Sequence, residues 1–262
     1  MNRLRIIASS VGLVAALIQP ALAQTPTSSQ APVRDPQALA VLQQSILNMG
    51  TAAPGDSTAT GTITTIAGSL TENGTITIMT RGSDQTFEQI QTPHGSTIVY
   101  SQGQASRLEN SSPVALPMER AVTSQCELFP LPLLVGALNS PDVAYKYVGL
   151  ETLNGATVHH IQLWNSFASI APLQSIAAFS VRDVWIDSNS SLPVKIFYAR
   201  RDAGGSAPSF AMEVFFSDYR RISGVLYPFS IQESFNGTPW ATIAIQNVAL
   251  NTGLTDANFP VQ

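Results

Sequence analysis

Apolar and polar residues alternate along the C-terminal part of the chain. Between Phe210 and Phe235 an apolar side chain recurs at nearly every second position, which is typical of β-strands with one buried face. Ser223-Gly224 and Asn236-Gly237 interrupt the alternation, and such pairs favour tight turns between antiparallel strands. We therefore predict three consecutive antiparallel strands, the last of them covering Thr238–Leu250. The apolar face of this sheet must be covered, either by the protein itself or by a ligand.

Segments rich in Thr, Ile and Val fill most of the remaining chain, within Thr58–Glu109 and Ala144–Tyr198. These residue types favour strands, and turn pairs such as Asn73-Gly74 and Gln102-Gly103 separate the segments. Short strands at regular spacing predict a mainly β protein. We expect a single large curved antiparallel sheet that forms an incomplete barrel of about eleven strands. An N-terminal helix and short lid helices complete the expected fold.

A helix is predicted directly after residue 34. Asp35 is a suitable N-cap, Pro36 fits the first helical position, and Gly50 ends the segment. Four apolar residues recur within it at helical spacing, so they form one stripe that we expect to pack against the core. The stripe consists of Leu39, Leu42, Ile46 and Met49.

Two apolar segments interrupt the strand pattern. Cys126–Leu138 is apolar almost throughout, and its prolines disfavour a regular strand. We predict a short helix that begins near Pro132. Because this helix has no polar face, it should be covered on all sides. Ser166–Ala178, which Pro172 interrupts, is the second segment and should be irregular.

The first residues have the pattern of an export signal. Arg3 and Arg5 precede the apolar run Ile6–Ile18, and Ala21–Ala23 offers a small-residue cleavage site. The apolar run is shorter than the roughly 20 residues of a membrane-spanning helix. We therefore expect residues 1–23 to be a signal peptide cleaved after Ala23, residues 24–34 a flexible leader, and residues 35–262 a single domain in the periplasm.

Composition argues for a folded chain and against nucleic-acid binding. Of the 262 residues, 44% are hydrophobic and 11% are charged, which favours a buried core over disorder. The formal net charge is −4 and lysine is nearly absent, so the basic stripe that nucleic acids require is missing. Cys126 is the single cysteine. It cannot form an intramolecular disulfide, and we expect it to be buried rather than to act as a nucleophile.

Sequence patterns typical of catalysis do not occur: there is no Gly-x-Ser-x-Gly, no His-Glu-x-x-His and no phosphate-binding glycine loop. His159 and His160 are neighbours in a predicted strand, so they point to opposite faces and cannot share a metal ion. Asp183 and Asp187 could form a carboxylate pair, but apolar residues alternate with them, which favours a solvated outer face. We predict a binding protein without cofactor or metal rather than an enzyme.

Several segments resemble the outer-membrane lipoprotein carrier (LolA-like) superfamily. An export signal, a helix, a β meander, a mid-chain apolar helix and closing strands follow each other in an order similar to that of the family. The most specific parts are Phe216–Pro228, Leu250-Asn251 and Asp256–Pro260, which look like the ending of bacterial members. Ile76–Arg81, followed by Ser101–Gly103, is similar to the family's strand that ends in a basic residue and to its later Asp-Gly turn.

This resemblance implies an incomplete antiparallel barrel with helices over its mouth, which holds an acyl chain or another lipid. The implied partners are a lipid or lipoprotein acyl chain and inner- or outer-membrane proteins. Arg81 matches the family's strand-end arginine, which in lipoprotein carriers latches the lid helix. The chain departs from the family at Gly82, where proline is common, and at Ala105–Arg107, which stands in place of aromatic residues.

An open barrel needs side chains that line it and side chains that cover it. The candidates for the lid are Leu131, Leu133, Leu134, Val135 and Leu138. The candidates for the cavity wall are Trp164, Trp185, Met212, Phe216, Phe229, Ile231 and Trp240. These residues either contact a cargo or fill a closed core. Two other functions stay open at this point: a sensor or interaction domain of the same fold that binds a partner protein, and a secreted hydrolase.

Overall fold

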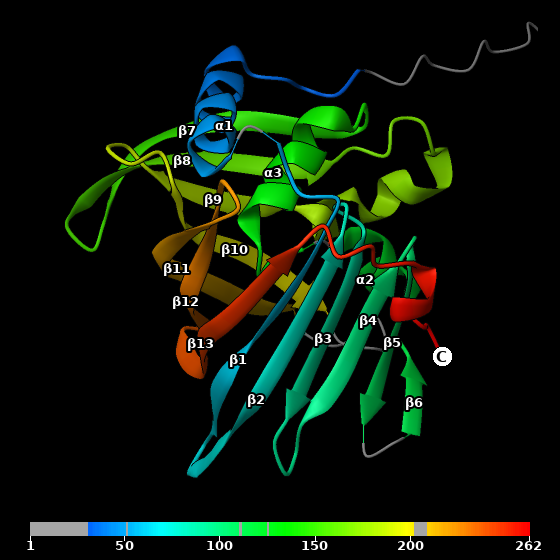
Figure 1. The fold of residues 1–262 in the computed structure, drawn as a ribbon. Coiled ribbons are helices and arrows are strands. Elements are labelled where there is room, and N and C mark those ends of the chain that lie inside the picture. The colour runs from blue at the N-terminus through cyan, green and yellow to red at the C-terminus, as the bar shows by residue number, and fades with distance from the viewer. Residues whose placement is uncertain (1–30, 51, 110–111, 125, 202–208) are drawn as a thin grey trace, which may run out of the picture.

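The computed structural model describes residues 31–262 except residues 51, 110–111, 125 and 202–208, and within them the chain forms thirteen strands and a few helical segments (Figure 1). The predicted export signal and residues 24–30 of the predicted leader lie outside the described residues. The strands are β1 Asp56–Ala67, β2 Leu70–Arg81, β3 Gln85–Gln91, β4 Ser96–Ser101, β5 Gln104–Glu109, β6 Ser112–Ala115, β7 Val143–Leu153, β8 Ala156–Asn165, β9 Arg182–Asp187, β10 Pro193–Arg201, β11 Ser209–Ile222, β12 Val225–Phe235 and β13 Thr238–Leu250. The helical segments are α1 Pro36–Met49, α2 Met118–Thr123, α3 Pro130–Asn139 and the 3-10 segments η1 Ala171–Ser180 and η2 Asp256–Asn258.

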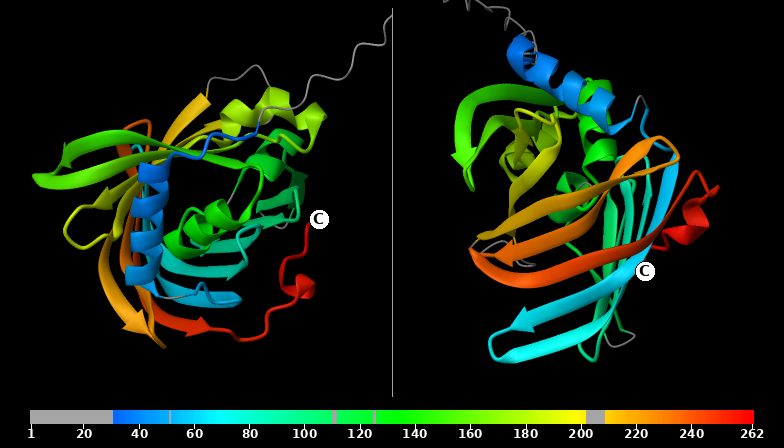
Figure 2. Two further views of the ribbon diagram at one scale, coloured as in Figure 1. Left: turned by 90° about the horizontal axis from the view of Figure 1, so that it is seen from above. Right: turned by 60° about the vertical axis from the view of Figure 1, so that its left-hand side comes forward.

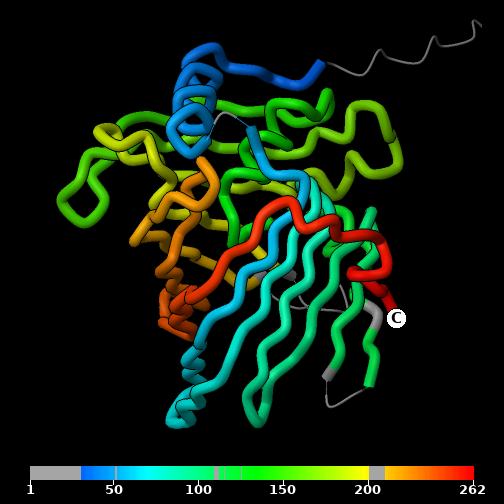
Figure 3. Tube along the Cα trace, in the orientation of Figure 1, coloured from blue at the N-terminus to red at the C-terminus, as the bar shows by residue number. Residues whose placement is uncertain are grey.

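All strands belong to one antiparallel sheet in the order β6-β5-β4-β3-β2-β1-β13-β12-β11-β10-β9-β8-β7. The first and last strands, β1 and β13, therefore pair at its centre, and the two edges are β6 and β7. The sheet curves strongly (Figures 1 and 3), but β6 and β7 do not pair, so it is not closed into a barrel. The expectation of a single curved antiparallel sheet is confirmed, with thirteen strands in place of about eleven.

The closing strands confirm the alternation seen in the sequence. Met212, Val214 and Phe216 of β11 are buried, and Phe216 pairs with Ile231 of β12. The hairpin between β12 and β13 turns at Asn236-Gly237, where φ is 49° and 75°, as such a turn requires. The apolar face of these strands is the concave face of the sheet.

The N-terminal helix α1 begins and ends where the sequence predicts. The Asp35 carboxylate accepts hydrogen bonds from the backbone N–H groups of Gln37 and Ala38, which is the usual way to satisfy the first N–H groups of a helix. Leu42 and Met49 of the predicted stripe are fully buried, and the other two residues of the stripe pack partly buried against the same core.

Two helices lie against the concave face. Seen from above, α3 lies inside the curve of the sheet (Figure 2), and α1 packs on α3, β7 and β12. The ring of Phe129, which directly precedes α3, contacts the ring of Tyr227 of β12 with centroids 4.3 Å apart. The main core of the molecule is therefore the volume enclosed between the curved sheet and these helices.

Three local features differ from the sequence prediction. Asn73 and Gly74 lie inside β2, and the hairpin turns at residues 68–69 instead. A Cβ at position 74 would lie 2.0 Å from the carbonyl oxygen of Gln91, so glycine is needed there because β3 approaches closely. The two prolines of Ser111–Thr123 predict a break in the strand pattern, but Pro113 lies in the edge strand β6, which tolerates proline, and α2 follows Pro117 directly.

Candidate functional site

The concave face is a continuous apolar surface that spans both halves of the sheet. Its central side chains are at most 2% exposed and belong to one hydrophobic cluster. They are Ile161, Val184, Ile196, Val214 and Ile231 in one half, and Ala59, Ile63, Ile76, Ile78 and Ile243 around β1. Apolar surface of this extent is stable only when something covers it.

The covering element is α3, which carries the five predicted lid residues. Leu131, Leu133 and Leu134 are fully buried, and Val135 and Leu138 are partly buried against the same core. Because leucines on several sides of this short helix are buried, α3 is inserted into the hollow rather than laid on the surface. The helix itself is confirmed, although it begins at Pro130.

The far side of α3 is seated on the turn between β2 and β3. A Cβ added to Gly136 would lie 2.5 Å from the Ser83 Cβ, which is too close for any side chain larger than glycine's. A cavity of 350 Å³ lies beside this contact, lined among others by Gly82, Val135 and Asn139. The glycine therefore sets how closely the helix approaches the sheet.

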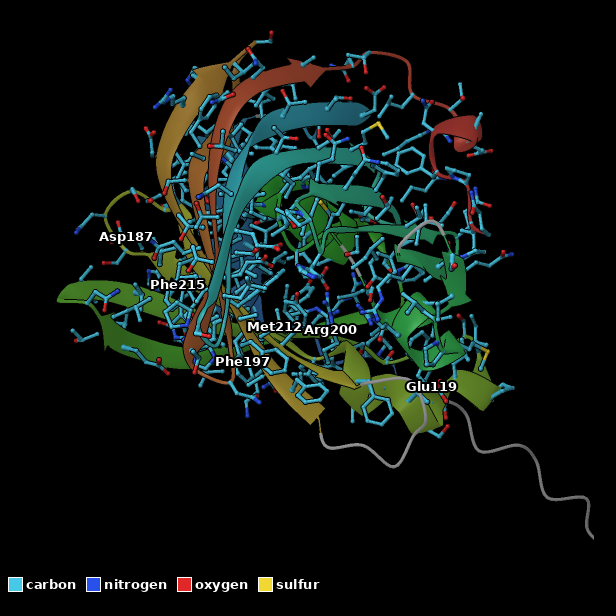
Figure 4. The ribbon with its side chains drawn as sticks, turned by 90° about the horizontal axis from the view of Figure 1, so that it is seen from below. Glu119, Asp187, Phe197, Arg200, Met212 and Phe215 are labelled. Atoms are coloured by element: carbon cyan, nitrogen blue, oxygen red, sulfur yellow. The ribbon has the colours of Figure 1, made fainter. Side chains whose placement is uncertain are left out.

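The predicted wall residues divide between the two faces. Met212, Phe216, Phe229 and Ile231 lie buried on the concave face, and Met212 lies inside the curve of the sheet seen from below (Figure 4). Trp240 packs partly buried against the same core and borders a cavity of 140 Å³.

The other two predicted wall residues, Trp164 and Trp185, lie on the opposite, convex face. Strand alternation puts Trp164 opposite to the buried Leu163. The Trp185 ring stacks on His160 with centroids 4.4 Å apart and its indole N–H donates to Glu151 at 2.7 Å. Partners on the outer surface thus account for the partial burial of Trp185, and strand register turns both tryptophans away from the hollow.

Arg81 lies at the end of β2, as the sequence predicts, and the polar partners described for its side chain lie outside α3. Its guanidinium pairs with Asp256 of η2 at 2.5 Å and donates to Gln85 at 3.0 Å. The helix touches the turn that follows the arginine. Arg81 therefore joins β2 to the C-terminal segment.

Charged side chains gather at the end of the hollow beside α2. Arg182 of β9 and Glu127 form an ion pair at 2.8 Å with both side chains almost fully buried, and Arg182 also donates to the carbonyl oxygen of Thr123 at 2.6 Å. The Arg182 guanidinium lies 4.9 Å from the centre of the Tyr198 ring. A buried ion pair of this kind needs such additional partners to offset the loss of hydration.

Three more charged residues face the same end: Glu88 of β3, Arg200 of β10 and Glu233 of β12. Burial raises the pKa of Glu88 to about 8, with the Glu233 carboxylate adding to the shift and Arg200 opposing it. Burial also raises the pKa of Glu233 to about 7, again opposed by Arg200. Seen from below, Arg200 lies inside the curve of the sheet (Figure 4). Arg120 of α2, which donates to the Tyr100 hydroxyl at 3.0 Å, also acts on the Glu88 carboxyl. We call these six residues the polar cluster: Glu88, Glu127, Glu233, Arg120, Arg182 and Arg200.

Sequence reasoning overlooked the polar cluster, although strand alternation contains its signal. Arg200 follows Ile196 and Tyr198 at even spacing, and Glu233 follows Phe229 and Ile231. A charged residue in register with buried apolar ones is predicted to point inward. The cost of burying it then indicates a site with a special role.

The cysteine and the two neighbouring histidines considered as catalytic candidates make structural contacts. Cys126 is fully buried, and burial raises the pKa of its thiol, which makes it unreactive. His159 bonds Tyr147, and His160 bonds Asp183, so the two imidazoles have different partners. Within the described ranges, no group of three or more potential ligands could hold a metal ion, and no helix is both long and apolar enough to cross a membrane.

The fold is that of known structures, whereas the sequence is distant from them. No protein-family model and no curated protein match the sequence. A domain assigned to outer membrane lipoprotein-sorting proteins from Vibrio parahaemolyticus superposes with a TM-score of 0.56 at 11% identity, covering 85% of this chain and 96% of that one. A LolA superfamily protein from Nitrosomonas europaea gives 0.55 at 13% identity, with coverages of 85% and 97%. A DUF1329 family protein from Desulfovibrio piger gives 0.52 at 12% identity, with coverages of 86% and 99%. The protein therefore has the LolA-like fold.

Proposed function

We propose that the protein is an exported, non-catalytic carrier that holds the acyl chain of a lipid or lipoprotein against its concave face. The observation that carries this proposal is the insertion of α3, a helix apolar on several sides, into a hollow with a continuous apolar wall. Such a helix occupies the place that an acyl chain would take. The likeness to a lipoprotein-sorting domain supports the proposal through the fold.

The energetics favour exchange between helix and cargo. Each methylene group moved out of water contributes about 0.8 kcal/mol, and a fully buried leucine side chain about 1.5–3 kcal/mol. The three fully buried leucines of α3 thus have the same order of burial energy as several methylene groups of a lipid. A long acyl chain can displace such a helix, and the helix can later displace the chain.

An unsatisfied hydroxyl group under the helix supports the same conclusion. The Tyr227 side chain is fully buried beside Phe129, and its hydroxyl has no hydrogen-bond partner among the residues that the structure describes. Leaving such a group unpaired costs about 1–3 kcal/mol. A core that served stability alone would gain from a partner at this position, whereas an interior that exchanges its contents has less need of one.

Organic extraction of protein purified from its native host, followed by mass spectrometry, tests the proposal directly. We expect a lipid in a near-stoichiometric amount. An extract without lipid, together with tight co-purification of another protein, would instead favour an interaction domain of the same fold.

A variant pair tests whether α3 and cargo compete. Leu134→Ala shortens a fully buried side chain of α3, whereas Leu47→Ala changes a leucine of α1 that is 58% exposed. Titration with a fluorescent acyl probe should show tighter binding for Leu134→Ala and no change for Leu47→Ala. Equal affinities for both variants and the unmodified protein would show that the cargo does not replace α3.

Export to the periplasm is part of the proposal and rests on residues 1–23. The expected mature protein begins at Gln24. N-terminal sequencing of the protein from the periplasmic fraction of its host checks this, and an intact N-terminus in the cytoplasmic fraction would contradict it.

A further inference from the structure

The polar cluster brings charges from the two halves of the sheet into one interior volume. Glu88 belongs to β3, and Arg200 and Glu233 belong to β10 and β12, on the other side of the central β1–β13 pair. Glu88 pairs with the buried Ile78 of β2, and Arg200 and Glu233 follow the buried Ile196 and Ile231 at even spacing on their strands. All three side chains therefore point to the concave face, and the raised pKa of Glu88, to which the Glu233 carboxylate adds, fits this placement.

Glu88 and Arg200 are not fully enclosed by other side chains. Each is half-buried and keeps part of its surface accessible to water. A side chain that points to the concave face and stays partly accessible borders the hollow rather than filling the core.

The hydrogen-bonding capacity of Arg200 is largely unused. A guanidinium group has five N–H donors. With the described part of the chain, that of Arg200 makes one hydrogen bond, to the Tyr198 hydroxyl at 3.2 Å, and it lies 5.4 Å from the Tyr198 ring centre. Among the described residues, no carboxylate forms an ion pair with Arg200. No hydrogen bond joins the Glu88 carboxyl to any of these residues either. A guanidinium charge without a partner and a buried neutral carboxyl without a hydrogen bond are both costly, so both groups call for an external partner.

The chemistry of the available groups defines that partner. Arg200 offers N–H donors and a positive charge. With the pKa of Glu88 at about 8 and that of Glu233 at about 7, these carboxyl groups hold protons near neutral pH and offer O–H donors. A ligand that satisfies all three must supply several oxygen acceptors and a negative charge, as carboxylate and phosphate groups do.

We propose that Arg200, with Glu88 and Glu233, binds the anionic headgroup of an amphiphile whose acyl chain lies along the apolar wall beside α3. The inference rests on the proposed carrier function and specifies its ligand: a fatty acid or a lipid phosphate rather than a neutral lipid. The apolar wall binds the chain, and the polar cluster selects the head and fixes its direction in the hollow.

Binding of three ligands with the same chain tests the headgroup site. Hexadecanoate, hexadecyl phosphate and hexadecanol are titrated into the delipidated full protein by calorimetry below their micelle concentrations. We expect one or both anions to bind about tenfold or more tightly than the alcohol, as a charge-assisted hydrogen bond would give, and the tighter anion identifies the source of the headgroup. Equal affinities for all three overturn the headgroup site and leave the carrier intact, whereas no binding at all overturns both.

Variants of Arg200 test whether this residue causes the preference for the anions over hexadecanol. Arg200→Gln should remove most of the difference between anion and alcohol and leave the affinity for hexadecanol unchanged. Arg221→Gln is the matched control, because that arginine is exposed and bonds only the carbonyl oxygen of Gly224. Arg200→Lys, which keeps the charge, should retain part of the preference. An unchanged preference in Arg200→Gln, with folding verified by circular dichroism, refutes the assignment.

The pH dependence gives an independent readout. As Glu88 and Glu233 lose their protons, they repel an anion, so the affinity for hexadecanoate should fall between about pH 6 and about pH 9, while that for hexadecanol stays constant. Glu88→Gln, which stays neutral, should reduce this fall. The other charged or titratable groups near the cluster are Glu127 with Arg182, Arg120 with Tyr100, Arg107 of β5, and Tyr198. A flat profile for hexadecanoate would contradict the role of the two carboxyl groups.

Discussion

Replacing Gly136 with alanine tests how α3 is seated. The new Cβ would lie 2.5 Å from the Ser83 Cβ, where ordinary contact begins near 3.4 Å, so the helix or the turn must retreat by about 1 Å. Overpacking of this kind costs about 1–3 kcal/mol. Alanine is also the better helix former, by about 1 kcal/mol. We therefore expect Gly136→Ala to lower the free energy of unfolding by up to about 2 kcal/mol.

A double-mutant cycle separates the two contributions. Ser83→Gly removes the Cβ that the new alanine would meet, and Ser83 does not adopt a positive φ that would complicate the change. In the Ser83→Gly background, Gly136→Ala should stabilise the protein by about 1 kcal/mol, because only the gain in helix propensity remains. Urea unfolding followed by circular dichroism measures all four proteins.

The sign of the change in unfolding free energy shows whether α3 rests on the β2–β3 turn. If Gly136→Ala stabilises the protein equally in both backgrounds, α3 does not rest on the β2–β3 turn and the seating described here is wrong. If the cycle shows a coupling of about 1–3 kcal/mol, the contact is real. The destabilised helix should then compete less well with cargo, so the acyl probe should bind more tightly to Gly136→Ala.

Four further outcomes are expected. Cys126 should not react with a thiol reagent until the protein is unfolded in urea, because its thiol is buried with a raised pKa; rapid labelling under native conditions would contradict this. Arg81→Leu should leave the rate of cargo release unchanged and cost less than about 1 kcal/mol in stability, because its ion pair is exposed; slower release would restore the latch role. Arg182→Met, which removes the buried ion pair of Glu127, should cost about 3–5 kcal/mol in urea unfolding, and a cost below 1 kcal/mol would show that this end of the hollow is hydrated. Because Glu88 holds its proton in the folded protein with a pKa of about 8 against an ordinary 4.5, the stability should fall as the pH rises between these values, and Glu88→Gln should flatten that fall; an identical slope in the variant would refute the assignment.

Local signals in the sequence sufficed for the elements that are governed by local physics. The alternation from Phe210 to Phe235, the cap at Asp35 and the turn at Asn236-Gly237 all appear in the structure as predicted. In each case the period of burial or the backbone conformation of a turn residue determines the element. Such features need no knowledge of distant parts of the chain.

Other features depend on contacts that the sequence does not display. Asn73-Gly74 has the pattern of a turn but lies in β2, because the neighbouring strand approaches too closely for a side chain. Trp185 has the composition of a wall residue but lies on the convex face, since only the register of β9 with its neighbours decides its direction. Glu88 and Arg200 point to the same concave face from strands far apart in the sheet, which follows only from the order and curvature of the whole sheet.

The strand order has a mechanical consequence. The two rims of the hollow, β6 and β7, follow each other in the sequence, and the stretch that joins them contains α3. The helix α3 is thus connected at both ends to the two edge strands between which it lies. Under the proposed carrier function, a guest that separates β6 from β7 would also act on the stretch that carries α3, which couples entry of the guest to displacement of the helix.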